Sequence, residues 1–209
     1  MSQIIFIDND QNFIKDKDGT QYWYRNLQLH RDNDQPAIIK INGTQEWYQN
    51  NKLHRYNDKP AIISDDGTQY WYQNGKLNRE NDQPAIINNH TKEWYQNNKL
   101  HRDNDQPAVI KSNGTQFWYQ NDNYHRNNDK PAVIFNNGNQ RWYQNGKLHR
   151  DNDQPAIIEN NGVLLWYQNG KLHRDNSKPA LINTDGSLEW YIDGVKQENG
   201  ELDGNFVKG

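Results

Sequence analysis

The sequence predicts an all-β protein, an elongated and twisted antiparallel β-meander built from repeats of about 24 residues. The phrase WYQNGKLHRDNDQPAII recurs in variant forms along the 209-residue chain. Its Trp recurs every 24 residues, except for one step of 23, and two turn signals follow each Trp. No pattern typical of a helix is present. The eight Trp are Trp23, Trp47, Trp71, Trp94, Trp118, Trp142, Trp166 and Trp190.

The first two strands of a repeat form a hairpin. Residues 44–49 are rich in aromatic and β-favouring types, and residues 52–55 return after the turn Asn50-Asn51. Several other repeats carry Asn-Gly at this turn, the preferred pair for a type I′ hairpin because both positions need positive φ. Leu27 is a poor fit at the second turn position, so we expect the first hairpin turn to be irregular.

A loop and a third, short strand complete the repeat. The loop has the form x-Asn-Asp-x-Pro, in which Asn57 tolerates left-handed backbone and Pro60 removes a hydrogen-bond donor. Residues 61–63 form the third strand, and an Asx-Gly turn leads to the next Trp. The repeat ending at Trp94 lacks this Gly and one residue, which accounts for the step of 23.

Side-chain alternation assigns the two faces of the sheet. Across the Asn-Asn turn, Tyr48 lies opposite Leu53 and Trp47 lies opposite His54, so Tyr and Leu share one face while Trp and His share the other. We therefore expect a thin sheet with an aromatic stripe on each side. The repeat framework comprises Trp47, Tyr48, His54, Arg55, Asn57, Pro60, Ala61 and Ile63.

The repeats imply one domain over residues 1–209. Residues 1–19 are a degenerate half repeat that caps the N-terminus, residues 20–189 hold seven repeats, and residues 190–209 are a partial repeat that caps the C-terminus. A parallel β-solenoid is the alternative architecture. The Asx-Gly hairpin turns favour the meander.

Composition excludes several classes of function. The formal net charge of −3 provides no bulk attraction to nucleic acid or anionic membrane, and the absence of Cys excludes disulfides and thiolate metal sites. No segment has the apolar length of a signal peptide core or a membrane span. We expect a cytoplasmic or virion-associated protein.

The Asn-Gly-Lys turn, the His two residues after its Lys, and the second Asx-Gly turn resemble MORN-type repeats. The nearer resemblance is to the WY-x-NGK variant of antitoxin-like bacterial proteins and of repeat proteins from large DNA viruses and phages. It covers roughly residues 18–194 and implies a meander used as a scaffold or recognition surface, with no catalytic residues. The period here is one residue longer, and Arg-x-Asn-Asp-x-Pro replaces the paired glycines that follow the hairpin.

The recurring His and Arg have structural interpretations. In a meander, equivalent His residues lie on the order of 10–14 Å apart and cannot share a metal ion, so we expect each His to pack against Trp. Each Arg is expected to form a carboxylate fork that pins the Asn-Asp loop to a strand end, and a phosphate-binding ladder is the alternative. The segment Asp8-Asn9-Asp10 only weakly resembles a calcium loop. No nucleophile motif occurs, and we expect no enzyme activity, cofactor or metal.

The residue before each Trp varies, so packing does not dictate one type there and a partner is one explanation. We predict partner-binding roles for Tyr22, Tyr70, Phe117, Arg141 and Leu165.

These features favour a non-enzymatic repeat scaffold that binds another protein or a second copy of itself. The alternatives are a lectin-like module that binds carbohydrate or cell wall, and an antitoxin-like protein that binds a partner. Single-stranded nucleic acid bound along the Trp stripe is a weaker alternative, because of the negative charge.

Overall fold

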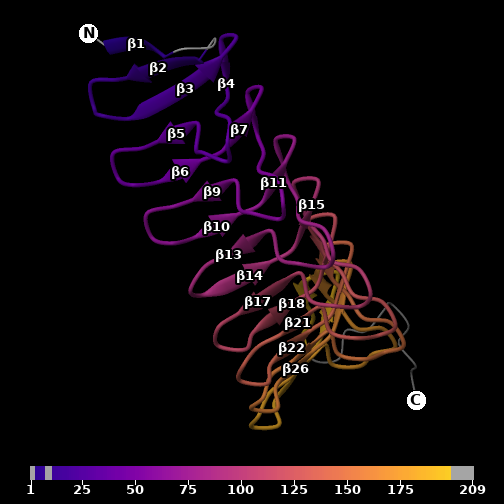
Figure 1. Ribbon diagram of the computed structural model, residues 1–209. Helices are drawn as coiled ribbons and strands as arrows, with labels where there is room; N and C mark the ends of the chain where they lie inside the picture. The colour runs from indigo at the N-terminus through magenta and orange to yellow at the C-terminus, as the bar shows by residue number, and fades with distance from the viewer. Residues whose placement is uncertain (1–2, 8–10, 199–209) are drawn as a thin grey trace, which may run out of the picture. The chain divides into compact units, whose positions relative to one another are not determined.

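The computed structural model describes residues 3–7 and 11–198, and these form strands, turns and loops (Figure 1). The described residues contain no helix, and hence none that could span a membrane. The chain divides into two compact units, Met1–Arg102 and Asp103–Gly209, which are described separately. Within each unit every strand pairing is antiparallel, which confirms the all-β meander and leaves no parallel solenoid coil among the described strands.

In the first unit the meander strands pair in chain order. They are β1 (Gln3–Ile7), β2 (Gln11–Lys15), β3 (Gln21–Arg25), β5 (Ile38–Ile39), β6 (Gln45–Glu46), β9 (Ile62–Ile63), β10 (Gln69–Tyr70), β13 (Ile86–Ile87) and β14 (Thr91–Glu93). Separate hairpins pair β4 (Gln28–Leu29) with β3, β7 (Tyr48–Gln49) with β8 (Lys52–Leu53), β11 (Tyr72–Gln73) with β12 (Lys76–Leu77), and β15 (Tyr95–Gln96) with β16 (Lys99–Leu100).

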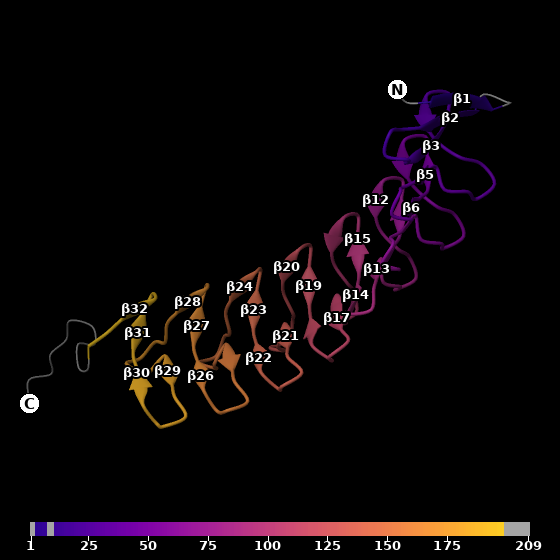
Figure 2. The ribbon, with the colours of Figure 1, turned by 90° about the vertical axis from the view of Figure 1, so that its left-hand side faces the viewer.

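The second unit repeats this arrangement. Figure 2 shows its hairpins along one edge and its meander turns along the other. The meander strands are β17 (Val109–Lys111), β18 (Gln116–Phe117), β21 (Val133–Ile134), β22 (Gln140–Arg141), β25 (Ile157–Ile158), β26 (Leu164–Leu165), β29 (Leu181–Ile182) and β30 (Leu188–Glu189). The hairpins are β19 (Tyr119–Gln120) with β20 (Asn123–Tyr124), β23 (Tyr143–Gln144) with β24 (Lys147–Leu148), β27 (Tyr167–Gln168) with β28 (Lys171–Leu172), and β31 (Tyr191–Ile192) with β32 (Val195–Lys196).

The Trp strand is split in two from the second repeat onward, where we expected one continuous strand. In the second repeat, β6 pairs with β5 and β9, whereas β7 pairs only with β8. Trp47 stands between them, because its N–H bonds to the carbonyl of Ala61 and its own carbonyl accepts the N–H of His54. A single residue, Trp47, therefore connects a strand of the meander sheet to a separate hairpin. Each repeat contributes strands to both, and its strands do not form one continuous three-stranded sheet.

The two turn types follow the sequence closely. In the Asx-Gly turn at Gly43, the N–H of Gly43 bonds to the carbonyl of Lys40, and Gly43 has a φ of +92°. This geometry is a three-residue hairpin loop with Gly in the left-handed position. Where the sequence is one residue shorter, the N–H of Asn88 bonds directly to the carbonyl of Thr91. A two-residue loop thus absorbs the deletion, and the pairing of β13 with β14 is kept.

The first hairpin turn is regular, so the expectation of an irregular turn is wrong. Asn26 and Leu27 have φ values of 50° and 59°, within the range that Asn50 and Asn51 adopt at the same turn. Tyr24 pairs with Leu29 as Tyr48 pairs with Leu53. The hairpin register, with Tyr24 opposite Leu29, therefore imposes a left-handed conformation on Leu27, a residue that is 85% exposed.

The core is a line of Trp and Ala. Seven of the Trp, from Trp23 to Trp166, are 5–7% exposed, and the Ala that follows each Pro is fully buried. From Trp47 onward, each Trp indole N–H donates to a loop carbonyl of the preceding repeat, as from Trp47 Nε1 to Asp34 O at 3.0 Å. The x-Asn-Asp-x-Pro loops thus hydrogen-bond to this line and contribute the Ala that packs within it.

Candidate interaction surfaces

The loop face of each unit carries a ladder of Arg side chains. The Arg55 guanidinium lies 3.7 Å from the ring centroid of Trp47 and donates to the carbonyl of Pro60. Its Nε and Nη2 also donate to the two carboxylate oxygens of Asp34, at 2.7 and 3.1 Å. The same fork joins Arg79 to Asp58, Arg102 to Asp82, Arg126 to Asp105, Arg150 to Asp129, and Arg174 to Asp153.

The expected Arg–carboxylate fork is present, but it joins consecutive repeats. Asp34 stands 21 residues before Arg55 and belongs to the preceding loop. The last described repeat is informative because Ser177 replaces the Asp and Glu198 stands where the next Arg is expected. Both partners of the ladder are lost together at that end, as an inter-repeat pairing requires.

The ladder strongly favours ionised Asp. Hydrogen bonds from Arg126, and then from Lys130, lower the pKa of Asp105 to about 2. Arg174 and Lys178 have the same effect on the pKa of Asp153, also to about 2. The Arg side chains are only 13–14% exposed, and each guanidinium already has three kinds of internal partner: a Trp ring, a Pro carbonyl and an Asp carboxylate. A phosphate-binding ladder would have to displace those partners.

The His side chains connect neighbouring hairpins. Nδ1 of His149 accepts the backbone N–H of Asn169 at 3.1 Å, and its Nε2 lies 3.0 Å from the Asp151 carboxylate. His173 makes the equivalent contacts with Asp193 N–H and Asp175. Each of these rings bonds to the next turn, a role that we did not predict when we expected His to pack against Trp.

Asn78 occupies the place of His in the third repeat and takes over the same bond. Its Oδ1 accepts the N–H of Asn97 at 3.3 Å, as Nδ1 of His54 accepts the N–H of Asn74 at 3.2 Å. A hydrogen-bond acceptor is therefore common to both residue types at this position.

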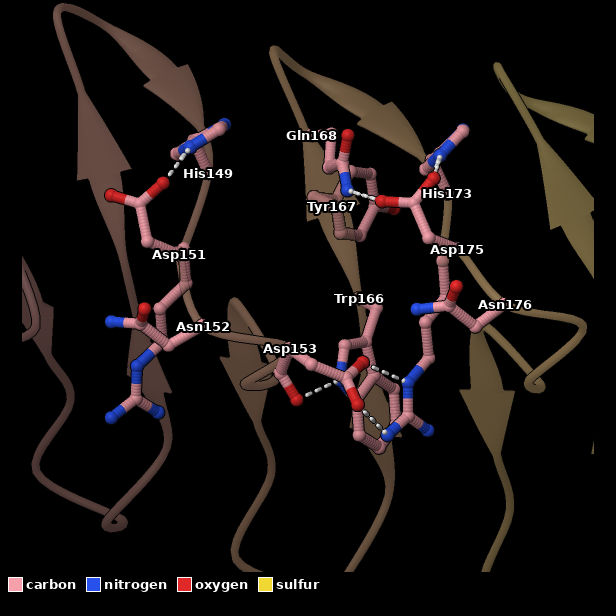
Figure 3. Close-up of a pocket in the computed structure, with 12 residues that line it drawn as sticks. His149, Asp151, Asn152, Asp153, Trp166, Tyr167, Gln168, His173, Asp175 and Asn176 are labelled. Atoms are coloured by element: carbon pink, nitrogen blue, oxygen red, sulfur yellow. Dashed lines mark hydrogen bonds and ion pairs between the residues drawn. The ribbon is translucent and has the colours of Figure 1, made fainter.

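Grooves lie between consecutive loops on this face. Figure 3 shows one of about 390 Å³, in which Asp151 points to His149 while Gln168 and His173 converge on Asp175. An equivalent groove of about 440 Å³ precedes it, and one of about 230 Å³ lies in the first unit beside His54 and Arg79. In the groove of Figure 3, several of the polar side chains bond to one another, so it offers few unused groups to a ligand.

No metal-binding group of His, Asp and Glu occurs among the residues that the structure describes. The segment Asp8-Asn9-Asp10, considered as a calcium loop, lies outside them.

The opposite face is formed by tyrosines, and we call it the tyrosine face. Tyr48 pairs with Leu53 as expected, and the eight equivalent tyrosines are all half-buried. They are Tyr24, Tyr48, Tyr72, Tyr95, Tyr119, Tyr143, Tyr167 and Tyr191. Burial raises the pKa of Tyr48 to about 12, so this phenol stays neutral and keeps its proton as a hydrogen-bond donor.

The variable residues predicted to bind a partner lie beside these tyrosines. Phe117 in β18 packs against Phe135 and Tyr124, with ring centroids at 6.3 and 6.1 Å. Arg141 in β22 donates to Glu159 at 2.8 Å and lies over the Phe135 ring. Phe117 and Arg141 therefore each contact a residue of this chain that suits their chemistry. Such contacts are a second reason why the residue before Trp varies, and we did not foresee it from the sequence.

The remaining three residues occupy the same register. Tyr22 pairs with Ile38 and donates its hydroxyl to Asp16. Tyr70 and Leu165 pair with aliphatic residues of the flanking strands. All five predicted residues are half-buried, so each leaves part of its side chain accessible.

Three positions on this face hold a Glu that pairs with the tyrosine two residues later. The Tyr48 hydroxyl donates to Glu46, the Tyr95 hydroxyl to Glu93 and the Tyr191 hydroxyl to Glu189. The position before Trp on the tyrosine face thus holds aromatic, cationic, aliphatic and acidic residues, while the backbone conformation stays the same.

Trp is not available for stacking against bases or sugars in most repeats. One ring face of each Trp from Trp23 to Trp166 carries an Arg guanidinium at 3.7–3.9 Å, and the ring is buried. Of the aromatic stripes predicted for the two sides of the sheet, only the one on the tyrosine face is accessible, because Arg covers the Trp rings. Neither a known protein family nor a curated protein matches the chain.

Proposed function

We propose that this chain is a non-enzymatic repeat scaffold whose tyrosine face binds another protein. The observation that carries the proposal is the row of half-buried tyrosines flanked by residues that change from repeat to repeat. Tyr and Arg are enriched among the residues that dominate protein–protein binding energy. Tyrosines already held by their neighbours lose little side-chain entropy on binding.

The varied neighbours would give the face its specificity. Phe117, Arg141 and Leu165 present an aromatic, a cationic and an aliphatic side chain on successive repeats of the second unit. A partner that matches this order gains contacts that a random protein surface does not. The MORN-like resemblance supports the same role, and an antitoxin-like function is the case in which the partner is a toxin.

Carbohydrate and nucleic-acid binding have less support. Both hypotheses relied on Trp as a stacking platform, and Arg covers one face of each buried Trp ring. Only the tyrosines remain for such contacts.

The test uses substitutions that the array already tolerates. Phe117→Glu, Arg141→Glu and Leu165→Glu place Glu two residues before Tyr119, Tyr143 and Tyr167, as Glu93 precedes Tyr95. The triple variant should therefore fold, as circular dichroism would check. Affinity capture with proximity labelling in the native host should recover a partner with the wild type and lose it with the triple variant.

The matched control is Asn127→Asp on the loop face, a position where other repeats carry Asp. It should keep the partner. Light scattering separates binding to a second copy from binding to another protein. Capture of the same proteins by the wild type and the triple variant would refute the proposal, as would a wild type that stays monomeric and captures nothing.

A further inference from the structure

Four hydrogen bonds between neighbouring hairpins end on an imidazole nitrogen that accepts, and two of them belong to rings with no carboxylate at the other nitrogen. Nδ1 of His54 accepts the N–H of Asn74, and Nδ1 of His125 accepts the N–H of Asn145, each at 3.2 Å. A ring nitrogen that accepts carries no proton, so these rings are neutral with the proton on Nε2. We propose that His54 and His125 form proton-sensitive clasps, which release the following hairpin turn when the protein is acidified.

Protonation would turn each accepting nitrogen into a donor. The new N–H would then face the backbone N–H of the turn, and two donors cannot form a hydrogen bond. The turn amide loses its partner, and the positive imidazolium repels the N–H dipole. The contact between one repeat and the next would therefore be weakened at that hairpin.

The Nε2 side explains why these two His differ from others. Nε2 of His149 and of His173 lies 3.0 Å from a negatively charged carboxylate. Nε2 of His125 bonds instead to Asn127, which is neutral. Nε2 of His54 is buried without a hydrogen-bond partner, and the Tyr56 ring packs edge-on at 4.4 Å.

The charged groups around His54 and His125 do not replace the carboxylate that these two rings lack at Nε2. Burial lowers the pKa of His54, so the folded state favours the neutral ring. Beside His54, the groove contains cations and anions in similar number, namely Arg55, Asp58, Lys59, Arg79 and Glu80. The groove beside His125 is lined by Arg126, Asp129, Lys130, His149, Arg150 and Asp151.

The chain contains its own non-titrating clasp. Asn78 makes the same bond to the N–H of Asn97 through an amide oxygen, which does not change charge between pH 5 and 8. A clasp at this position can therefore be built without an ionisable group, and Asn78 serves as an internal reference.

The experiment measures amide hydrogen exchange by NMR on the full chain between pH 7.5 and 5.0, corrected for intrinsic exchange rates. The Asn74 and Asn145 amides should lose protection by about tenfold as the pH falls, the consequence of losing one hydrogen bond. The Asn97 amide should keep its protection. His54→Asn and His125→Asn should abolish the pH dependence at Asn74 and Asn145.

Asn78→His provides the reverse test, because it should confer pH dependence on the Asn97 amide. Protection at Asn74 and Asn145 that is unchanged across this range would overturn the proposal. So would an equal loss at Asn97 in the wild type, because that loss would reflect general unfolding rather than a titrating clasp.

Discussion

At the residue scale, the Asn-Asp pair of each loop performs several tasks at once. Asn33 and Asp34 both adopt left-handed φ, near 57° and 55°. The carbonyl of Asp34 accepts the Trp47 indole N–H, and its carboxylate accepts the Arg55 fork. Asn at the first position is explained by local conformation alone, whereas Asp at the second also serves two partners from the next repeat.

Leu27 is the residue whose conformation is least suited to its type. A left-handed φ of 59° costs an L-residue other than Gly, Asn or Asp about 1–2 kcal/mol. Leu27→Gly should therefore raise the free energy of unfolding by about 1 kcal/mol, measured by urea denaturation. Leu27→Ala is the control, because it removes the exposed side chain and keeps the strain. A gain of equal size with Ala would show that the exposed leucine, not the backbone, is responsible.

At the element scale, the short strands depend on the Trp–Ala junction between them. Ala61 is fully buried, its carbonyl accepts the Trp47 N–H, and its own N–H donates to the carbonyl of Tyr70. Backbone from three consecutive segments meets at this small residue. A larger side chain here has no free volume to enter.

Ala61→Leu should destabilise the protein by about 1–3 kcal/mol, the cost of overpacking a filled site. Thermal unfolding followed by circular dichroism would measure the change. The control is Ile41→Ala, an exposed position in a meander turn that should change stability by less than about 0.5 kcal/mol. A tolerated Ala61→Leu would mean that the junction is not closely packed.

At the scale of the molecule, stability within each unit is distributed over equivalent interfaces between repeats. Each combines an Arg–Asp fork, a Trp–carbonyl bond and strand pairing with the next repeat. Such arrays are stabilised mainly by nearest-neighbour contacts. The absence of the Arg–Asp pair at Ser177 and Glu198 marks where this series stops.

Acid should weaken these interfaces together. The Asp105 and Asp153 pKa values are lowered to about 2, and Arg forks also lower the pKa values of Asp34, Asp58 and Asp129. Because the folded-state pKa lies below the unfolded value, this stability is complete above about pH 4 and is lost as the pH falls through about 2. The carboxylates are partly exposed, so each pair contributes at most about 1 kcal/mol.

Urea midpoints measured between pH 5 and pH 2 should fall steadily. Asp105→Asn with Asp153→Asn should lower stability at pH 5 and flatten the curve. An unchanged slope in the double variant would show that other carboxylates govern acid stability.

Much of the fold follows from local chemistry. The repeat period, the all-β class, the hairpin register of Tyr48 with Leu53 and the left-handed Asn turns all depend on residues close together in the chain. The irregular turn expected at Leu27 was wrong because the hairpin register outweighs the φ preference of a single residue. The tyrosine face could also be assigned from strand alternation.

The sequence by itself determined which residues recur and which turns they make. Only the tertiary structure decided where the recurring side chains reach: Arg55 to Asp34, His54 to the turn at Asn74, and Trp47 to the loop before it. The two members of each of these pairs stand 13 to 21 residues apart and belong to different repeats. The sequence of one repeat therefore does not show that they are paired. The physical reason is that the Trp of one repeat is held by groups from two repeats: Arg55 of its own repeat lies over the Trp47 ring, and the Asp34 carbonyl of the preceding loop accepts its indole N–H.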